Sequence, residues 1–409
     1  MRVGIAAIGT RGDVAPLTDV GARLLQAGHE VVMSAPTPFG KEIERCGLAF
    51  RDMGGDPQTS ELAGANVAKL VMAAVAPRTV LAMGTMVLDT LRDDQLDVLL
   101  LSPFAEFGGH PLAEARGIPS LGVRLQPLSA TGEYPPSVLG SWSLGRHGNL
   151  AAGRLAASLV DKLYGNVISE LRERLGLPAV GAGTLRRRRT ENGWPVLHGY
   201  SPSVLPRPSD WRAGLDVVGY WWPRRDLGWR PPGDLVDFLE AGPPPVVVGF
   251  GSFLTNRRNA ARLSEHVVGA LRTAGVRGIL QAGWAGLAAS GEDVLTVGEV
   301  PHDWLLHKAA ALVHACGAGT TAAGMRAGIP MIGVPVTGDQ PFWARKLRDH
   351  GMSPATVPYW RLSAKRLAAA VEAAVGDPSY RERARHIAAR LAREDGAGAV
   401  VKAVESLAR

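Results

Sequence analysis

A glycine-rich segment in the last third of the chain has the clearest potential for chemistry. It reads His-Ala-Cys-Gly-Ala-Gly-Thr-Thr over residues 314–321, and it joins an apolar run, 311–313, to a helical pattern, 320–327. Small residues at the start of a helix let backbone N–H groups approach an anion, and the helix dipole favours negative charge there. The side chains of His314, Thr320 and Thr321 add donors, so the segment suits a diphosphate. A tight strand-to-helix turn without a ligand is the alternative.

Asp339 and Gln340 follow the next apolar run, 331–334, in the sequence Pro-Val-Thr-Gly-Asp-Gln-Pro. Because the carboxyl ends of parallel strands share one edge of a sheet, both residues are expected beside the glycine-rich segment. A carboxylate accepts hydrogen bonds and an amide both donates and accepts them, which suits the hydroxyls of a sugar. Asp339 is also placed to cap a helix predicted over 341–347, and the two roles are compatible.

Three further strand ends contribute candidates. Ser252 follows a buried run in the sequence Phe-Gly-Ser and could donate to a phosphate, although a plain helix start also explains it. Trp284, Val300 and His302 lie at the next two strand ends and could frame a nucleotide base. Core packing is the alternative for Trp284, and helix capping is the alternative for His302.

Asp13 is the candidate general base. It ends the segment Gly-Thr-Arg-Gly-Asp, 9–13, between the first apolar run and the first helical pattern. A helix N-terminus stabilises an anion, so this carboxylate should stay ionised and could take a proton from a hydroxyl. A helix cap without a catalytic role is the alternative.

Two series of alternating strands and helices position these segments. Their apolar runs are typical of buried strands, which predicts parallel sheets with helices on both faces. The first series has strands at 2–8, 31–34, 48–51, 98–101 and 120–123, and helices at 14–27, 39–46 and 109–115. The second has strands at 245–250, 278–281, 294–297, 311–313 and 331–334, and helices at 260–274, 320–327, 341–347, 363–375, 380–391 and 400–407.

The predicted architecture is two doubly wound, Rossmann-like α/β domains that face each other across a ligand cleft. A length of 409 residues fits two domains. A Pro- and Trp-rich stretch without helical periodicity separates the two series. We assign 1–205 to the first domain, 206–232 to the linker, 233–385 to the second domain and 386–409 to a C-terminal helical segment.

Taken together, the motifs resemble the donor-site signature of family 1 glycosyltransferases. The matching stretches are Val-Pro-His-Asp-Trp-Leu at 300–305, the segment 314–321, and Gly-Asp-Gln-Pro-Phe-Trp at 338–343. Gly-Thr-Arg-Gly-Asp-Val at 9–14 is similar to the opening of the bacterial branch that contains glycopeptide-antibiotic glycosyltransferases and sterol glucosyltransferases. The resemblance runs through both halves in order, outside about 55–95 and 130–195.

The resemblance implies the GT-B fold, with the acceptor in the first domain, the nucleotide sugar in the second, and a C-terminal helix that crosses back. It implies an inverting, metal-independent transfer of a hexose or deoxyhexose from a UDP- or dTDP-sugar, a co-substrate rather than a cofactor, to a hydroxyl of a natural-product or sterol-like acceptor. Asp13 would be the general base. The residues expected to contact the nucleotide sugar, which include the strand-end candidates above, are Thr10, Arg11, Gly12, Ser252, Trp284, Val300, His302, His314, Gly317, Ala318, Gly319, Thr320, Thr321, Asp339 and Gln340.

The chain departs from the family pattern at two positions. Many relatives have a His as base near the position of Asp13, and this chain has none there, so the carboxylate must serve. Cys316 stands where the family usually has Gly. We expect its side chain to point into the core, because Gly317 and Gly319 remain.

Composition and charge limit the remaining function classes. Hydrophobic residues make up 46% and charged residues 20%, as in globular proteins. The net charge of +7 allows nucleic acid, an anionic membrane surface or a phosphorylated ligand as partner. No nucleic-acid motif accompanies the dense run Arg186–Arg189, which is expected to form a solvated loop. In a variant of the main hypothesis, this run docks the chain weakly on a membrane that carries a lipid acceptor.

Cysteine usage and hydropathy add three expectations. Cys46 and Cys316 lie too far apart in the sequence for metal-ligand spacing, so neither a zinc site nor a disulfide framework is predicted. No apolar run approaches the roughly 20 residues that span a membrane. The apolar N-terminus is too short for a signal peptide, so the expected location is the cytoplasm.

Two other functions stay open at this point. An NAD-dependent oxidoreductase is disfavoured because the spacing of Gly4, Gly9 and Gly12 lacks the tight Gly-x-Gly-x-x-Gly pattern, and the second strand ends without an acidic residue. A non-catalytic partner or activator of the same fold would be expected to lose Asp13 or Asp339. Apolar residues such as Met72 and Trp142 fit an apolar acceptor surface or core packing equally, and the choice between UDP and dTDP, the sugar and the oligomeric state stay open.

Overall fold

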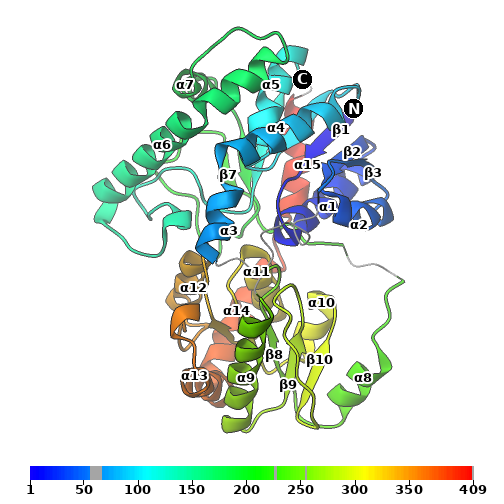
Figure 1. Cartoon of the computed structure of the whole chain (residues 1–409), viewed down its shortest axis with the longest axis vertical. Helices are drawn as coiled ribbons and strands as arrows, with labels where there is room; N and C mark the ends of the chain where they lie inside the picture. Colours follow the sequence, from blue (N-terminus) through cyan, green and yellow to red (C-terminus); the bar gives the residue numbers. More distant parts are fainter. Residues whose placement is uncertain (56–66, 225–227, 254–255, 408–409) are drawn as a thin grey trace.

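Two parallel sheets, each with helices on both faces, form the two halves of the molecule (Figure 1). The computed structural model describes residues 1–55, 67–224, 228–253 and 256–407. The doubly wound α/β architecture predicted from the sequence is confirmed. The strands of both sheets have fully buried apolar side chains, such as Val3 and Ile5 in the first sheet and Val247 and Val313 in the second.

The first sheet has seven parallel strands in the order β3-β2-β1-β4-β5-β6-β7. Its strands are β1 (Arg2–Ala6), β2 (Glu30–Ala35), β3 (Ala49–Asp52), β4 (Val98–Leu101), β5 (Ser120–Arg124), β6 (Val196–His198) and β7 (Leu215–Val217). Its helices are α1 (Arg11–Gln26), α2 (Gly40–Arg45), α3 (Val67–Ala74), α4 (Pro77–Leu91), α5 (Glu106–Arg116), α6 (Gly145–Glu173) and α7 (Ala182–Glu191), with short 3-10 turns η1 (Thr37–Phe39) and η2 (Ser137–Leu139).

The second sheet has five parallel strands in the order β10-β9-β8-β11-β12. Its strands are β8 (Val246–Gly249), β9 (Gly278–Gln281), β10 (Val294–Val297), β11 (Ala311–His314) and β12 (Met331–Gly333). The helices around it are α8 (Gly233–Glu240), α9 (Arg257–Thr273), α10 (His302–Leu305), α11 (Ala318–Ala327), α12 (Gln340–Asp349), α13 (Ala364–Gly376) and α14 (Pro378–Leu391), with the turns η3 (Leu306–Lys308) and η4 (Tyr359–Arg361).

The boundaries between the two halves differ from those assigned from the sequence. Strand β7 lies inside the predicted linker, 206–232, and pairs with β6, so the first sheet extends to Val217. Residues 225–227 of that linker, and 408–409 at the C-terminus, lie outside the described residues. Trp221 is buried in the core of the first half, and Trp229 packs edge-to-face on Trp304 of the second half.

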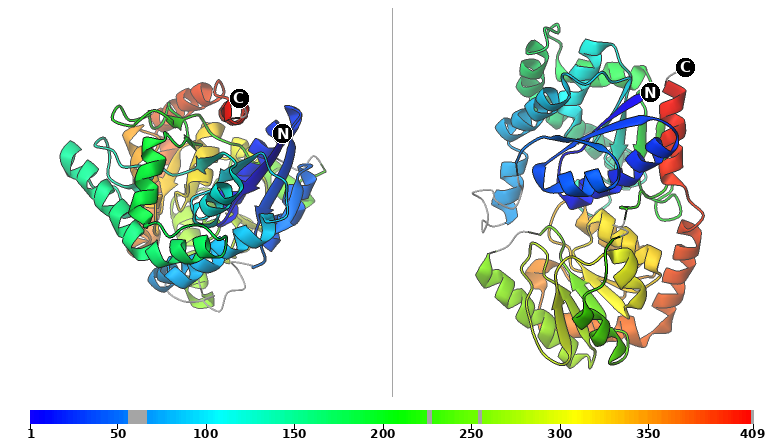
Figure 2. Two further views of the ribbon diagram at one scale, coloured as in Figure 1. Left: turned by 90° about the horizontal axis from the view of Figure 1, so that it is seen from above. Right: turned by 90° about the vertical axis from the view of Figure 1, so that its right-hand side faces the viewer.

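The return crossing to the first half comes after α14 and not at residue 386. Helix α14 packs on α11 of the second half, whereas α15 (Gly396–Leu407) packs on α1. Val400 and Val404 are fully buried in the core of the first half, and Figure 2 shows α15, in red, alongside it. The C-terminal helix therefore crosses back to the first half.

The run Arg186–Arg189 was expected to form a loop, and this expectation is wrong because the run lies within α7. Arginine is a good helix former, so a run of it does not break a helix. Arg186, Arg187 and Arg188 are exposed as expected, whereas Arg189 is partly buried.

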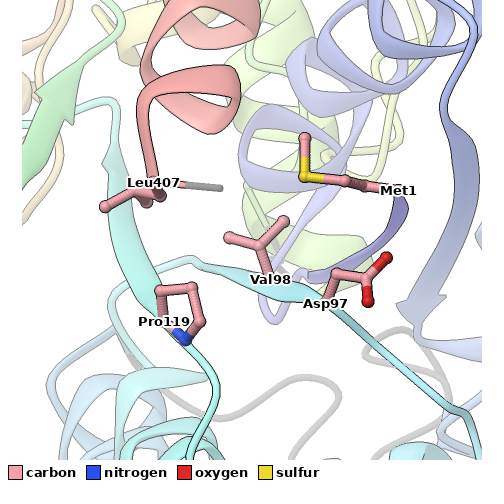
Figure 3. Close-up of a pocket in the computed structure, with 5 residues that line it drawn as sticks. All are labelled: Met1, Asp97, Val98, Pro119 and Leu407. Atoms are coloured by element: carbon pink, nitrogen blue, oxygen red, sulfur yellow. The ribbon is translucent and has the colours of Figure 1, made fainter. Parts of the chain in front are cut away.

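None of the helices in the described part of the chain is long and apolar enough to span a membrane. Two shallow cavities lie at the amino ends of the strands. One, of about 460 Å³, is lined by Met1, Asp97, Val98, Pro119 and Leu407 (Figure 3). The other, of about 410 Å³, includes Pro244 and Ala310 of the second half. Since ligands of open α/β sheets bind at the carboxyl ends of the strands, neither cavity is the candidate site.

Candidate active site

Asp13 lies in the first turn of α1, at the carboxyl end of β1. Helix α1 begins at Arg11 with Thr10 as N-cap, so Asp13 is the third helical residue and is not the cap itself. Its Oδ2 accepts hydrogen bonds from the backbone N–H of Thr10 at 2.9 Å and from the Thr10 hydroxyl at 3.1 Å. Burial raises the pKa of Asp13, while the bonds from Thr10 and Gln126 oppose that rise. Thr10 thus fixes one carboxyl oxygen.

Gln126, which the sequence did not single out, lies at the other carboxyl oxygen of Asp13. It follows β5, and its Nε2 is 3.5 Å from Oδ1 of Asp13. Arg124, two residues before Gln126, donates two hydrogen bonds of 2.9 Å to the carboxylate of Glu106. Burial alone would raise the pKa of Glu106, but Arg124 and His110 outweigh it and lower this pKa to about 2. A lone glutamine after a strand carries no local signal, so only the tertiary structure shows it beside Asp13.

Gly9 leaves room for the carboxyl of Asp13. Its φ is +142°, and a Cβ built on it would lie 2.3 Å from Oδ2 of Asp13. An L side chain rarely adopts this backbone conformation, and here it would also displace the carboxylate.

Gly9→Ala is therefore expected to lower the rate of the reaction that Asp13 serves by about 100-fold, the low end of what a positioned general base contributes. Gly28→Ala is the matched control, because Gly28 also has a positive φ, +86°, but no atom lies within 4 Å of its Cβ position. Both variants should lose similar stability in thermal melts, and only Gly9→Ala should lose turnover. Equal turnover in the two variants would show that the position of Asp13 does not matter.

Arg11 bridges the two halves. Its guanidinium is 3.0 Å from Glu299, which follows β10, and 3.3 Å from Glu42 of α2. The sequence predicted Arg11 near the phosphates; in this structure the side chain pairs with two carboxylates, and the prediction stays untested. The neighbouring Gly12 is exposed. The bridge shows that the carboxyl edges of the two sheets face each other, and α1 also packs against α11.

The glycine-rich segment follows β11 and leads into α11, as the sequence predicted. Helix α11 begins two residues earlier than predicted, at Ala318, with Gly317 as N-cap and no side-chain cap. The first N–H groups of a helix have no partner within it, so those of Ala318, Gly319 and Thr320 are open to an anion. A Cβ at Gly317 or Gly319 would meet no atom within 4 Å, so open space adjoins these donors. Thr321 is fully buried, and its hydroxyl has no hydrogen-bond partner.

Cys316 points into the core, as expected. It is fully buried, and its Sγ lies 2.7 Å from where a Cβ on Gly333 would stand. Its φ of +64° is the left-handed value that favours glycine, and it is the only such non-glycine in the described part of the chain. This backbone explains the glycine of relatives, and the thiol does not crowd the anion site.

Two histidines belong to this edge of the second sheet: His314, fully buried at the start of the glycine-rich segment, and His302, partly buried at the start of α10. Burial lowers the pKa of His314 to about 3 and that of His302 to about 4, so both imidazoles are neutral near pH 7. His314 Nδ1 accepts from the backbone N–H of Cys316 at 3.3 Å. His302 is the first residue of α10, whose N-cap is Pro301, so a capping role for His302 is wrong.

Gln281, at the end of β9, holds the neighbouring segment together and was also missed in the sequence. Its Nε2 donates to the carbonyl oxygen of Val300 at 3.2 Å, and its Oε1 lies 3.2 Å from Nε2 of His302. Val300 is buried. Trp284 is partly buried, and its backbone N–H donates to the carbonyl oxygen of Gly251 at 3.0 Å, which joins its loop to the one that carries Ser252.

Asp339 and Gln340 follow β12, at the same edge of the second sheet. Asp339 is the N-cap residue of α12, but its Oδ2 accepts from the indole Nε1 of Trp343 at 2.8 Å and makes no capping bond. Gln340 Oε1 accepts from the backbone N–H groups of Val336 and Thr337 at 2.7 and 3.2 Å. These bonds leave the second carboxyl oxygen of Asp339 and the amide N–H₂ of Gln340 available to a ligand.

Asp339 and Asp13 lie at the carboxyl edges of the two sheets, which face each other. Burial raises the pKa of Asp339 to about 6, the Trp343 bond lowers it, and the negative charge of Asp13 raises it further. Helix α1, which carries Asp13, packs against α11 of the second half. The structure therefore brings together a candidate base from the first half and the candidate sugar and phosphate groups from the second.

No group of three or more His, Cys, Asp or Glu side chains in the described ranges is arranged to hold a metal ion. The open N–H groups at the N-terminus of α11 are the donors that could receive an anion. Two facing Rossmann-like α/β domains are the architecture of the GT-B class of transferases.

Comparison with known proteins agrees with this class. Residues 3–134 match the family model of the glycosyltransferase family 28 N-terminal domain, and residues 279–407 match that of the erythromycin biosynthesis protein CIII-like C-terminal domain. O-mycaminosyltylonolide 6-deoxyallosyltransferase of Streptomyces fradiae is 34% identical over 97% of this chain and 95% of its own length. Sterol 3-beta-glucosyltransferase UGT80A2 of Arabidopsis thaliana is 32% identical over 98% of this chain, which spans 65% of that enzyme's length.

Solved structures share the fold over the whole chain. The Streptomyces sp. SF2575 glycosyltransferase SsfS6 in complex with thymidine diphosphate has a TM-score of 0.65 at 20% identity, covering 99% of both chains. The spinosyn rhamnosyltransferase SpnG in complex with spinosyn aglycone has a TM-score of 0.68 at 18% identity, covering 99% of this chain and 100% of the other. The chain belongs to this family of GT-B glycosyltransferases, with relatives that act on natural products or sterols.

Proposed function

We propose that the chain is an inverting glycosyltransferase that moves a hexose or deoxyhexose from a UDP- or dTDP-sugar to a hydroxyl of a natural-product or sterol-like acceptor, with Asp13 as general base. The observation that carries the proposal is the position of Asp13 in the first turn of α1, a helix that packs against α11 across the interface of the two halves. The named substrates of the relatives support both acceptor classes. The alternative of an NAD-dependent oxidoreductase has no support from the relatives described above, which are named as glycosyltransferases.

In the proposed reaction, the acceptor oxygen attacks the anomeric carbon from the face opposite the diphosphate. The new C–O bond forms as the bond from that carbon to the diphosphate oxygen breaks, and the diphosphate leaves with the electron pair. The hydroxyl proton goes to the carboxylate of Asp13. Attack opposite the leaving group inverts the anomeric centre.

The leaving diphosphate is proposed to bind at α11. Its growing negative charge would be stabilised by the N-terminal N–H groups of α11, by His314 and by Ser252, Thr320 and Thr321, so the transfer needs no metal. Thr10, Arg11 and Gly12 would face it from the first half, and Arg11 would exchange Glu299 for a phosphate. Trp284, Val300 and His302 would frame the base, and Asp339 and Gln340 would bind the sugar hydroxyls.

A nucleotide panel tests the donor site. Thermal melts of the full chain in buffer with EDTA are expected to show a higher melting temperature with UDP or dTDP, but not with GDP, ADP or NAD. A ligand that binds only the folded state at 100 times its Kd stabilises it by about 2.7 kcal/mol. The structures of relatives with thymidine diphosphate favour dTDP. A shift with NAD alone, or with no nucleotide, would contradict the donor site.

The stereochemistry is tested separately on the product. With an α-linked nucleotide sugar as donor, the coupling constant of the anomeric proton in the glycoside is expected to show a β-linkage. Retention of the donor configuration would contradict a single displacement and leave the donor site intact.

A further inference from the structure

Helix α6 exposes a stripe of large apolar side chains that no part of the proposed reaction uses. Leu155, Leu159 and Leu163 are 61%, 56% and 50% exposed. Their spacing of four residues places them on one face of the helix. The side of α6 that packs on its own domain is formed by other residues, among them Tyr164 and Leu171, which are buried. The stripe is therefore a second apolar face, beyond the one that the core requires.

A neighbouring helix carries a further exposed apolar side chain. Met72, in the last turn of α3, is 68% exposed. The end of α3 lies against α6, because the hydroxyl of Tyr164 donates to the carbonyl oxygen of Val75 at 2.7 Å. Figure 1 shows α6 running along the outside of the first half, with α3 below it. A row of large exposed apolar side chains on one helix face, as in α6, marks an interaction site.

Cationic side chains border the stripe. Arg154 and Lys162 are exposed and each immediately precedes a leucine of the stripe. Helix α7 packs beside α6, where Arg186 forms an ion pair of 2.8 Å with Asp161. Its four consecutive arginines are accompanied by a single acidic residue, Glu191, 3.9 Å from Arg187. The border therefore has a net positive charge.

We propose that α6 and α7 form a docking surface for an anionic lipid bilayer, with the leucine stripe inserted among the acyl chains and the cations at the headgroups. A helix with apolar side chains on one face and Lys or Arg beside them lies in the plane of a membrane interface in this way. A second copy of the chain fits the charges worse. A twofold contact through the stripe would bring the cationic borders of two identical surfaces together, and like charges repel.

Vesicle binding by the full chain tests the proposal. Co-sedimentation is expected to be at least about tenfold stronger with vesicles of phosphatidylcholine and phosphatidylserine than with phosphatidylcholine alone, and to fall at high salt. The combined variant Leu155→Ser, Leu159→Ser, Leu163→Ser should lose this binding. Val375→Ser on α13 is a control, because Val375 is also an exposed apolar residue, 40% exposed, far from the stripe.

A charge variant and a measurement of mass complete the test. Arg154→Gln with Lys162→Gln should weaken binding to the anionic vesicles and reduce its salt dependence, without removing any apolar surface. Absence of vesicle binding, or binding that the triple serine variant retains, would overturn the proposal. So would a dimer, measured by light scattering, that the triple variant converts to a monomer, since the stripe would then be an interface between copies.

Discussion

Replacing Asp13 with Asn is expected to lower the turnover of sugar transfer by about 100- to 10,000-fold, the contribution of a positioned general base, and to leave nucleotide binding unchanged. The amide keeps an oxygen that can accept from the N–H and hydroxyl of Thr10, which lie 2.9 and 3.1 Å from Oδ2. It cannot accept a proton from the acceptor hydroxyl. Because geometry is retained and basicity is lost, the effect should appear in kcat and not in the affinity for the nucleotide.

The measurement pairs single-turnover kinetics with the nucleotide-dependent rise in melting temperature. Asp89→Asn on α4 is the control, since Asp89 is an exposed carboxylate in the same half of the molecule. A normal rise in melting temperature with lost turnover assigns Asp13 to the chemical step. Undiminished turnover would remove Asp13 from the mechanism, and a lost nucleotide response would show that the substitution damages the interface between the halves.

The parts of the site that the sequence predicted are those with a local signature. Buried strands appear as apolar runs, and the candidate site residues lie at or beyond their ends, as with His314 at the end of β11 and Asp339 in the segment after β12. The order of strands along the chain then predicts that these ends share one edge. The structure alone explains two further residue types. Gly9 leaves room for the carboxyl of Asp13, and Cys316 occupies a left-handed backbone position that favours glycine.

The parts that the sequence missed depend on contacts distant in the chain. Gln126 lies 113 positions from Asp13, and Gln281 joins His302 to the carbonyl of Val300 from another strand. The short strand β7 is marked by only three residues, too few for a periodic signal. Helix α6 lacks a single periodic pattern, because it has one apolar face against the core and another toward solvent.

Replacing Asp339 with Asn is expected to stabilise the protein near pH 7 and to impair transfer. The pKa of Asp339 is about 6 in the folded chain against an ordinary value of 3.8, mainly because of burial. Between about pH 4 and pH 6 the folded state therefore binds more protons than the unfolded state, so stability falls as pH rises through this window. The ionised carboxylate costs about 1–3 kcal/mol above the window, and the neutral amide removes that cost. The amide oxygen can still accept from Trp343.

The variant and the unmodified chain should thus differ in stability at pH 7 and converge at pH 4, when measured by denaturant unfolding. Asp349→Asn, at the other end of α12, lacks the burial and should show no such gain. Transfer by Asp339→Asn should fall by about 10- to 100-fold, the value of one hydrogen bond to a charged group. A stability gain with undiminished transfer would place Asp339 outside the sugar site. Lost transfer without a gain in stability would mean that burial does not disfavour the ionised carboxylate. The stability measurement therefore tests the electrostatic origin of the raised pKa, and the transfer measurement tests the role of Asp339 in binding.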